Sequence, residues 1–597
     1  MPASGQAPVT IAPDGNGFVV TTPIYTARVL EDGNLHSLVV KGVEMLDDKV
    51  GDSAGAYLSV NGPVKFAKVE MVDPTTLKAT TQDAEITYKL APDYIALEVL
   101  QSLKPSAPLF VILSKAFERA NNMSGPGSVK GIATGWWGTV RFITGVGPVL
   151  HVDGLSNTWG PWPDAADGRQ VCQADALQGQ PRSLVLVVGE GAWPEDLVSL
   201  HMSCSRPDFL FFRGEQPSVA VEVVNDGALF EVMLTCTLAA LDGKALSAQA
   251  VPVTVQPNAS AKASFELAKA NQPGFYDVTA DFRQGKFLVR RETITVGFAP
   301  DELRPPLYRQ PDFHDFWKAT LDEARAMPLD PQLTTVPERS DEQVTVYKLN
   351  LAGLNASRWY AWYCVPNAPG RHPAVLVLPA YGDGPVGAPV AWARRGAAAL
   401  ALQGREHDVD LPQYEGKPYM LEGIDARETY VYRRIYAACV RCVDFLCDRP
   451  EVDPEKIAVT GASQGGGLAL ATAALDPRVK LCMPDVPFLS DYPETIWRAG
   501  YPYKEIADYL AANPDQGERL LGVLSYFDAM NLAPDINCPV LMSVGLRDRT
   551  CPPQTVYAVL NQIPSRKEMR VYPFMGHAEP PEQQPIKEQR LTELAGG

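Results

Sequence analysis

Residues 457–467 read IAVTGASQGGG, and this stretch decides the fold of the C-terminal half of the chain. Its first four residues predict a short buried strand, and the Gly- and Ala-rich run that begins at Gln464 predicts a helix. Between them, residues 461–465 fit the pattern G-x-S-x-G, in which small residues let the chain reverse sharply behind a serine. The stretch therefore predicts a nucleophilic Ser463 on a strand–turn–helix unit.

Strands and helices alternate on both sides of this turn. Residues 313–326 have a helical apolar spacing, and further helices are expected near 388–396, 428–447 and 464–474, with short apolar strands between them. Such alternation indicates a parallel sheet that is covered by helices on both faces. Together with the serine turn it predicts an α/β-hydrolase domain over residues 299–597.

A serine hydroxyl is a weak nucleophile, and it needs a base and an acid that orients the base. His577 is the only histidine that follows Ser463, and it lies just after the strand MRVYPF. Two acids compete for the third role, namely Asp548 after the strand VLMSVGL and Asp485 after KLCMP. We favour Asp548 because it lies in an open loop ahead of a Pro-Pro turn. The predicted catalytic triad is thus Ser463, Asp548 and His577.

The tetrahedral intermediate of acyl transfer needs two preset hydrogen-bond donors. One is expected to be the backbone N–H of Gln464, which directly follows the nucleophile. The other is expected to come from the loop after the strand LVLPA, from the backbone N–H of Tyr381. The alternative for Tyr381 is a role as a wall of the pocket.

The composition excludes several classes of partner. The formal charge is −17 and the pI is about 5.0, so nucleic acid is not expected as a partner. The sequence contains no apolar run near the ~18 residues of a membrane span, and residues 1–10 (MPASGQAPVT) lack the features of a signal peptide. The ten cysteines are scattered, and we interpret them as buried free thiols. Neither a metal nor another cofactor is predicted.

The first 300 residues read as strands. Residues 1–204 are predicted to form an all-β domain, and residues 205–298 contain strands at roughly ten-residue spacing, which is typical of an immunoglobulin-like β-sandwich. Within the first domain Trp159 and Trp162 belong to a group of four tryptophans. Their indoles could stack on sugar rings, and the alternative is packing in the core or between domains.

The C-terminal half resembles the acetyl xylan esterase/cephalosporin C deacetylase family. The likeness covers residues 300–590 and includes FHDFWKATLDEA, RPEVDPEKIAVTGASQGGGLALA, VGLRDRTCPPQTVYAVLN and YPFMGH. The resemblance implies the same triad, an oxyanion hole at Tyr381 and Gln464, and metal-free removal of acetyl groups from xylo-oligosaccharides and other small esters. It also implies a possible homo-oligomer, because many members are hexamers.

The chain departs from this family in two places. Residues 404–408 read GREHD where the family has an Arg-Gly-Gln-Gly turn, and we expect a solvated loop there. The β region is absent from simple members, and it resembles the β-supersandwich and immunoglobulin-like pair ahead of some enzymes that act on polysaccharides. A secreted or periplasmic location is therefore favoured over a cytoplasmic one.

Two other functions remain open from the sequence. A serine peptidase of the prolyl-oligopeptidase type also places β structure before an α/β-hydrolase domain, but its propeller needs a repeat of about 50 residues, and we find none. A carbohydrate-binding scaffold with an inactive hydrolase domain would be favoured by a missing triad residue, and all three are present.

Overall fold

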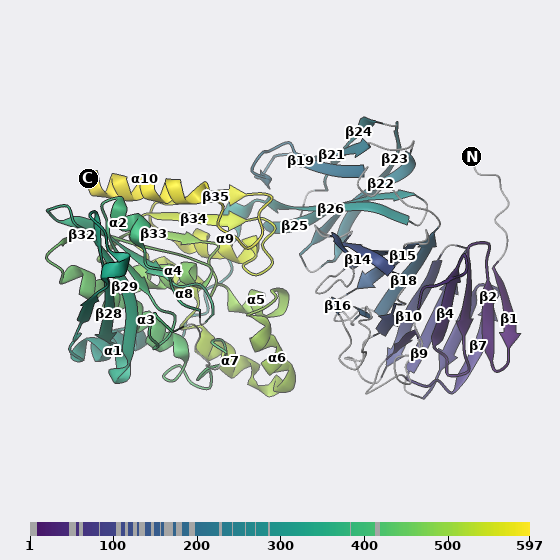
Figure 1. The fold of residues 1–597 in the computed structure, drawn as a ribbon, viewed down its shortest axis with the longest axis horizontal. Helices are drawn as coiled ribbons and strands as arrows, with labels where there is room; N and C mark the ends of the chain where they lie inside the picture. The colour runs from purple at the N-terminus through teal and green to yellow at the C-terminus, as the bar shows by residue number, and fades with distance from the viewer. Residues whose placement is uncertain are drawn as a thin grey trace.

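The structure is a computed structural model. It describes residues 9–46, 55–58, 64–82, 84–92, 94–102, 109–113, 117–122, 128–130, 138–144, 149–155, 157–159, 171–174, 182–189, 198–225, 230–241, 243–256, 258–268, 270, 272–284, 287–382, 384–411 and 418–596. Three parts follow one another along the chain, and Figure 1 shows them from the β-rich N-terminal part to the α/β part at the C-terminus. We call the described residues of 9–189 the first β unit, those of 198–298 the β-sandwich, and those of 299–596 the α/β unit.

The α/β unit is built on one mixed sheet, whose described strands follow the order β27-β28-β29-β31-β30-β32-β33-β34-β35. The strands from β31 to β35 run parallel, and the first three are antiparallel to their neighbours. Their bounds are β27 Gln332–Thr335, β28 Val344–Ala352, β29 Arg358–Pro366, β30 His372–Leu378, β31 Ala398–Leu402, β32 Val452–Ala462, β33 Val479–Asp485, β34 Val540–Gly545 and β35 Lys567–Tyr572.

Helices cover both faces of this sheet, because alternate residues of the apolar strands point to opposite sides. Ala458 of β32 packs with α2 and α10, whereas its neighbours Ile457 and Val459 pack with α3 and α4 on the other face. The helices are α1 Phe313–Ala326, α2 Val390–Arg394, α3 Val431–Cys447, α4 Gln464–Leu475, α5 Tyr492–Arg498, α6 Lys504–Ala512, α7 Gly517–Leu524, α8 Ala529–Leu532, α9 Pro553–Gln562 and α10 Gln583–Gly596. The predicted helix over residues 313–326 is therefore correct at both ends.

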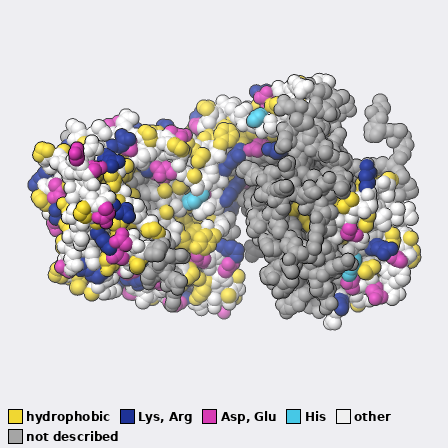
Figure 2. Space-filling view, in the orientation of Figure 1, with side chains coloured by type: hydrophobic (Ala, Val, Ile, Leu, Met, Phe, Trp, Pro, Cys, Tyr) yellow, Lys and Arg dark blue, Asp and Glu magenta, His cyan; other side chains and the backbone are white. Residues whose placement is uncertain are grey.

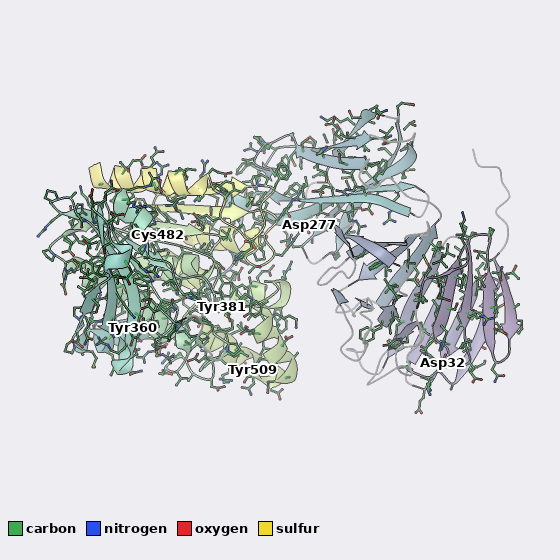
Figure 3. All side chains as sticks on the ribbon, viewed as in Figure 1. Asp32, Asp277, Tyr360, Tyr381, Cys482 and Tyr509 are labelled. Atoms are coloured by element: carbon green, nitrogen blue, oxygen red, sulfur yellow. The ribbon has the colours of Figure 1, made fainter. Side chains whose placement is uncertain are left out.

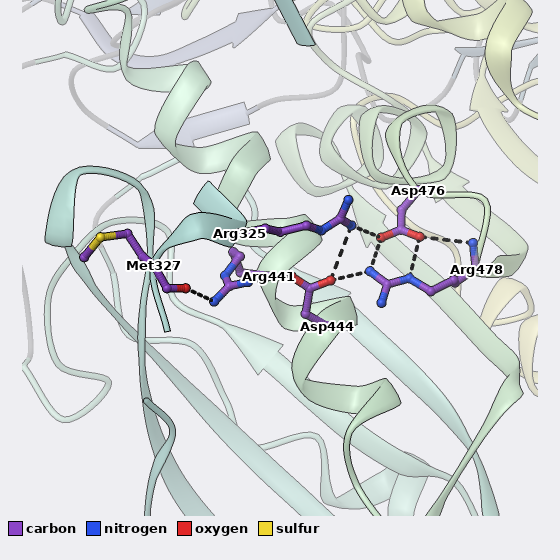
Figure 4. A network of polar contacts seen from close by, with 6 residues as sticks. All are labelled: Arg325, Met327, Arg441, Asp444, Asp476 and Arg478. Atoms are coloured by element: carbon purple, nitrogen blue, oxygen red, sulfur yellow. Dashed lines mark hydrogen bonds and ion pairs between the residues drawn. The ribbon is translucent and has the colours of Figure 1, made fainter. Parts of the chain in front are cut away.

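An ion-pair network fastens α1, α3 and the end of α4 to one another (Figure 4). Asp476, which is 1% exposed, accepts hydrogen bonds from Arg478 and Arg325. Asp444 of α3 pairs with the same two arginines and, over 2.8 Å, with Arg441. Because Asp476 is buried, Asp444 is only partly exposed and each has several donors, their charges are compensated where water is scarce.

The β-sandwich consists of two sheets with the strand orders β19-β21-β24 and β20-β26-β25-β22-β23. Its strand β19 hydrogen-bonds to β21, although the sequence placed residues 198–204 in the preceding domain. The strands are β19 Val198–Cys204, β20 Leu210–Phe211, β21 Ser218–Asn225, β22 Phe230–Ala240, β23 Ala245–Val255, β24 Ala259–Glu266, β25 Gly274–Gln284 and β26 Phe287–Phe298. We propose that the domain boundary lies before Val198.

The first β unit contains two large sheets, with the orders β1-β2-β3-β4-β6-β11-β17-β16 and β13-β12-β14-β15-β18-β10-β9-β8-β7. Alternate apolar residues of both sheets form one buried core. The strands are β1 Thr10–Asp14, β2 Gly17–Thr21, β3 Tyr25–Val29, β4 Leu35–Val40, β5 Val43–Glu44, β6 Ala56–Leu58, β7 Lys68–Asp73, β8 Thr76–Thr80, β9 Ala84–Leu90, β10 Tyr94–Ser102, β11 Leu109–Ile112, β12 Phe117–Asn122, β13 Ser128–Lys130, β14 Gly138–Thr144, β15 Val149–Leu155, β16 Asn157–Trp159, β17 Val171–Ala174 and β18 Arg182–Gly189. The predicted fold class, β domains followed by an α/β-hydrolase domain, is confirmed.

The surface of the α/β unit carries charged side chains of both signs. Acidic and basic side chains are interspersed over the visible face of the α/β unit in Figure 2. Among the helices of the described chain, none has the length and apolar character that crossing a bilayer requires. The side chains of nine cysteines are described, and all nine are free thiols, seven of them buried.

Candidate active site

Ser463 lies on the turn between β32 and α4, with φ 57° and ψ −119°. A positive φ is strained for a residue other than glycine, so the surrounding structure must hold it. The N–H of Ser463 donates to the carbonyl of Asp485, and its carbonyl accepts from the N–H of Phe488, both over 2.9 Å. A Cβ atom on Gly465 would lie 2.3 Å from the carbonyl oxygen of Leu378, so the turn requires glycine at this position.

The predicted triad residues come together although they are far apart in sequence. Asp548 follows β34 and His577 follows β35, so both lie at the same edge of the sheet as Ser463. Nε2 of His577 lies 2.8 Å from Oγ of Ser463, and its Nδ1 lies 2.8 Å from Oδ2 of Asp548. With Nδ1–H donating to the carboxylate, Nε2 is left as the acceptor for the serine proton.

The surroundings fix the orientation of the Asp548 carboxyl group. Its carboxylate is fully buried, and Oδ1 accepts hydrogen bonds from the backbone N–H groups of Thr550 and Cys551, each over 2.8 Å. These bonds leave Oδ2 for His577.

Asp485, the alternative acid, is engaged elsewhere. Its buried carboxylate accepts from Oγ of Ser543 over 2.6 Å and from Nζ of Lys587 over 2.7 Å. Lys587 also pairs over 2.6 Å with Glu579, two residues after His577. Burial disfavours the charged ammonium, but Asp485 and Glu579 outweigh it and raise the pKa of Lys587. Asp485 therefore stabilises the turn of Ser463: its carboxylate binds Lys587, and its backbone carbonyl accepts the N–H of Ser463.

The two residues predicted for the oxyanion hole are neighbours in space. The Gln464 side chain is buried, donates from Nε2 to the carbonyl of Ala380 over 3.3 Å, and accepts at Oε1 from the hydroxyl of Tyr432 over 2.8 Å. Gln464 is the first residue of α4, where a backbone N–H has no acceptor within the helix. Its side chain therefore ties the serine turn to the loop of Tyr381.

The Tyr381 ring forms part of an aromatic cluster. Its hydroxyl donates to Oε1 of Glu505 in α6 over 3.1 Å, and its ring centroid lies 5.0 Å from that of Tyr419 and 5.7 Å from that of Tyr501. Burial raises the pKa of the Glu505 carboxyl. The sequence interpretation missed α5, α6 and α7, although the spacing of KEIADYLAA (504–512) is amphipathic and could have indicated α6.

The loop at residues 404–408 is not a solvated loop, so that prediction is wrong. Arg405 is 2% exposed, pairs with Glu422 over 2.7 Å, and lies 3.8 Å above the ring centroid of Tyr419. His407 is also buried and contacts the amide of Gln403. The loop therefore supports Tyr419, which in turn contacts Tyr381.

The tryptophan prediction stays untested. Trp162 lies outside the described residues, and Trp159 is described only as the last residue of β16.

One group of side chains in the described part of the chain has the spacing of a metal site. Ligand atoms of Asp548, Cys551 and His577 all lie within 4.8 Å of one another. His577 already hydrogen-bonds to both Asp548 and Ser463, so a cation there would compete with those hydrogen bonds. The absence of a metal from the reaction remains a prediction.

Comparison with known proteins identifies the family of the C-terminal half. The profile of the acetyl xylan esterase (AXE1) family matches residues 301–592. The acetyl esterase Axe7A of Xylanibacter ruminicola is 31% identical over 332 residues, which cover 53% of this chain and 73% of that one. The chain belongs to the acetyl xylan esterase family.

Two solved structures of this family are similar over the same half. The acetyl xylan esterase from Paenibacillus sp. R4 is 33% identical, with 49% of this chain and 98% of that chain covered and a TM-score of 0.46. Acetyl xylan esterase 1 from Thermoanaerobacterium sp. JW/SL YS485 is 30% identical, with 49% and 97% covered and a TM-score of 0.46.

The resemblance inferred from the sequence is therefore confirmed, and the chain is a carboxylic ester hydrolase. Its relatives support a carbohydrate esterase function and acetylated carbohydrates as substrates. Family membership favours this function over a prolyl-oligopeptidase-type peptidase and over an inactive binding scaffold.

Proposed function

We propose that this chain removes acetyl groups from acetylated xylan or xylo-oligosaccharides through a serine-linked acetyl intermediate. The observation that carries the proposal is the continuous hydrogen-bonded chain from Oγ of Ser463 through His577 to the buried Asp548, with both links at 2.8 Å. Ser463 is the nucleophile, His577 the general base and acid, and Asp548 the group that orients the imidazole and stabilises its charged form.

In the first half-reaction Oγ of Ser463 attacks the carbonyl carbon of the acetyl group, and its proton passes to Nε2 of His577. The backbone N–H groups of Gln464 and Tyr381 donate to the oxyanion of the tetrahedral intermediate. The bond to the sugar oxygen then breaks, and His577 gives that oxygen the proton. The deacetylated sugar leaves, and the acetyl group remains on Ser463.

In the second half-reaction a water molecule replaces the sugar. His577 takes a proton from the water as its oxygen attacks the acetyl carbon, and the same two N–H groups bind the new oxyanion. The bond to Oγ breaks, Ser463 regains the proton from His577, and acetate leaves.

The surroundings of Tyr381 suit a sugar. Tyr501 is 63% exposed, and its ring stands edge-on to the ring of Tyr381. An exposed aromatic face beside Tyr381, a proposed oxyanion donor, can stack on a pyranose ring. Replacing Tyr501 by alanine should therefore raise KM for an acetylated xylo-oligosaccharide more than KM for p-nitrophenyl acetate.

The proposal is tested by measuring acetate release from acetylated xylan, together with hydrolysis of p-nitrophenyl acetate and of a prolyl amide. Ser463→Ala should abolish release while the circular dichroism spectrum stays that of the wild type. Rapid quenching should trap one acetyl group on the peptide that contains Ser463. Cleavage of the prolyl amide without acetate release, or activity of Ser463→Ala above about 1% of wild type, would refute the proposal.

A further inference from the structure

The loops that carry the proposed acid and base also contact the β-sandwich. Arg547 and Arg549 flank Asp548 in sequence, and each pairs with a carboxylate of the β-sandwich. Nη2 of Arg547 donates to Oε1 of Glu292 in β26. Nη2 of Arg549 donates to both carboxylate oxygens of Asp277 in β25, over 2.8 and 2.7 Å. The loop that carries Asp548, called the acid loop below, is therefore held by one ion pair on each side of Asp548.

Arg547 also connects the acid loop to the loop of His577. Its backbone N–H donates over 2.9 Å to the carbonyl of Met575, two residues before the histidine. Its guanidinium carbon lies 5.3 Å from the ring centroid of Phe574, and that ring meets Phe209 of the β-sandwich edge-on, with centroids 5.2 Å apart. The acid loop, the histidine loop and the β-sandwich thus meet around one arginine.

The β-sandwich holds the carboxylate of Asp277 in place and contacts α9 beside it. Oδ1 of Asp277 accepts from the hydroxyl of Thr295 on the neighbouring strand β26 over 2.8 Å. The backbone N–H of Phe275 donates over 3.0 Å to Gln554 at the start of α9, and its ring lies 5.1 Å from that of Tyr557. Figure 3 shows Asp277 at the end of the β-sandwich that faces the α/β unit.

We infer that Glu292 and Asp277 are positioning residues, through which the β-sandwich holds the loops of Asp548 and His577 in the geometry that catalysis requires. The inference rests on the proposed function, because it assigns to these loops the acid and the base. The side chains of Glu292 and Asp277 are 28% and 21% exposed, and ion pairs at such sites contribute little to the free energy of unfolding. A small displacement of a catalytic group, however, can lower a rate strongly.

The test uses the full-length chain with Glu292→Gln, Asp277→Asn and the double variant. We expect kcat for p-nitrophenyl acetate to fall about three- to tenfold in each single variant and further in the double, while KM and Tm change little. The charge reversal Arg547→Glu should lower kcat, and adding Glu292→Arg should restore part of it. A purely structural role would lower Tm without this recovery of kcat.

The matched control is Glu302→Gln. Glu302 belongs to the 3-10 turn Pro300–Glu302 and forms a bidentate pair with Arg213 of the β-sandwich, over 2.5 and 2.6 Å, outside both loops. It should keep the kcat of the wild type. Wild-type kcat in Glu292→Gln and Asp277→Asn, or an equal loss in Glu302→Gln, would overturn the inference. The proposed function is tested separately, by trapping an acetyl group on Ser463 of the wild type, and that result does not depend on Glu292 or Asp277.

Discussion

Nδ1 of His577 lies 2.8 Å from Oδ2 of Asp548, whereas the carboxylate of Asp485 is bound by Ser543, Gln583 and Lys587. Both acids are fully buried and both end a strand or follow one closely. Their partners differ: Asp548 hydrogen-bonds to the imidazole of His577, and Asp485 pairs with the ammonium group of Lys587. The two carboxylates should therefore respond differently to the same conservative substitution.

Asp548→Asn should lower kcat for p-nitrophenyl acetate by about 10³- to 10⁴-fold, because an amide favours the wrong tautomer of His577. Asp485→Asn should affect kcat much less and should instead lower Tm, since Lys587 loses one of its two acidic partners. Steady-state kinetics and thermal unfolding of both variants check this ranking. The reverse ranking of kcat would give the catalytic role to Asp485.

Tyr432→Phe should weaken the oxyanion hole indirectly. The substitution removes the hydroxyl that donates to Oε1 of Gln464, so a buried acceptor is left without that donor. We expect a loss of about 1–3 kcal/mol in the free energy of unfolding and a fall in kcat with little change in KM. Urea denaturation and kinetics measure the two effects. Tyr430→Phe is the control, since its hydroxyl donates to the carbonyl of Met420 and not to Gln464.

Metal removal should leave the activity unchanged. The proposed chemistry needs a neutral imidazole with a free Nε2 and two N–H donors, and a cation on Asp548, Cys551 and His577 would block that imidazole. Dialysis against EDTA should thus preserve hydrolysis of p-nitrophenyl acetate, and added Zn²⁺ should inhibit it. Cys551→Ser should weaken the inhibition, because thiolate is a stronger Zn²⁺ ligand than a hydroxyl group. Loss of activity in EDTA that a divalent metal restores would contradict the proposed mechanism.

Much of the α/β unit could be predicted because its signals are local. The strand, Ser463 and the helix behind it are adjacent in sequence, and α1 begins and ends where its apolar spacing does. The strands that Asp548 and His577 follow could also be predicted, and parallel strands end at one edge of a sheet, so the two residues were expected close together. These local patterns were therefore enough to propose the catalytic residues.

The rest depends on contacts between distant segments. Arg405 and His407 read as loop residues, yet Glu422 and the ring of Tyr419 allow the arginine to be buried. Strand β19 lies outside the range 205–298 that the sequence predicts for the sandwich, because only its pairing with β21 reveals its sheet. The ion pairs of Arg547 and Arg549 with the β-sandwich likewise leave no periodic pattern in the sequence.

Trp159 and Trp162 should affect the deacetylation of polymers more than that of small esters. Remote binding of a sugar chain lowers the barrier only for substrates that reach the remote site. The double variant Trp159→Ala/Trp162→Ala should keep hydrolysis of p-nitrophenyl acetate within about threefold of wild type. Deacetylation of polymeric xylan should lose ~1–3 kcal/mol of transition-state binding per stacked ring. An equal loss on both substrates would indicate a structural role.

Asp491 should make the folded protein less stable as pH rises, whereas most carboxyl groups make it more stable. It lies directly before α5 and is 4% exposed, and burial, together with the charge of Asp528, raises its pKa to about 7 from the ordinary value of 3.8. Between these two values the folded chain keeps a proton that the unfolded chain releases. The free energy of unfolding should therefore fall as pH rises through this window and level off above pH 7.

Asp491→Asn removes the charge at every pH, and asparagine tolerates the left-handed backbone of this position, φ 50°. The variant should therefore gain stability over wild type, by about 3 kcal/mol more at pH 8 than at pH 5. Urea denaturation at both pH values measures this difference. Glu494→Gln is the control on the same helix, because Glu494 is partly exposed and pairs with Arg498 over 2.7 Å, so its effect should vary much less with pH. If Asp491→Asn gave the same change at both pH values, the carboxyl of Asp491 would have to ionise in the folded protein as readily as in the unfolded chain.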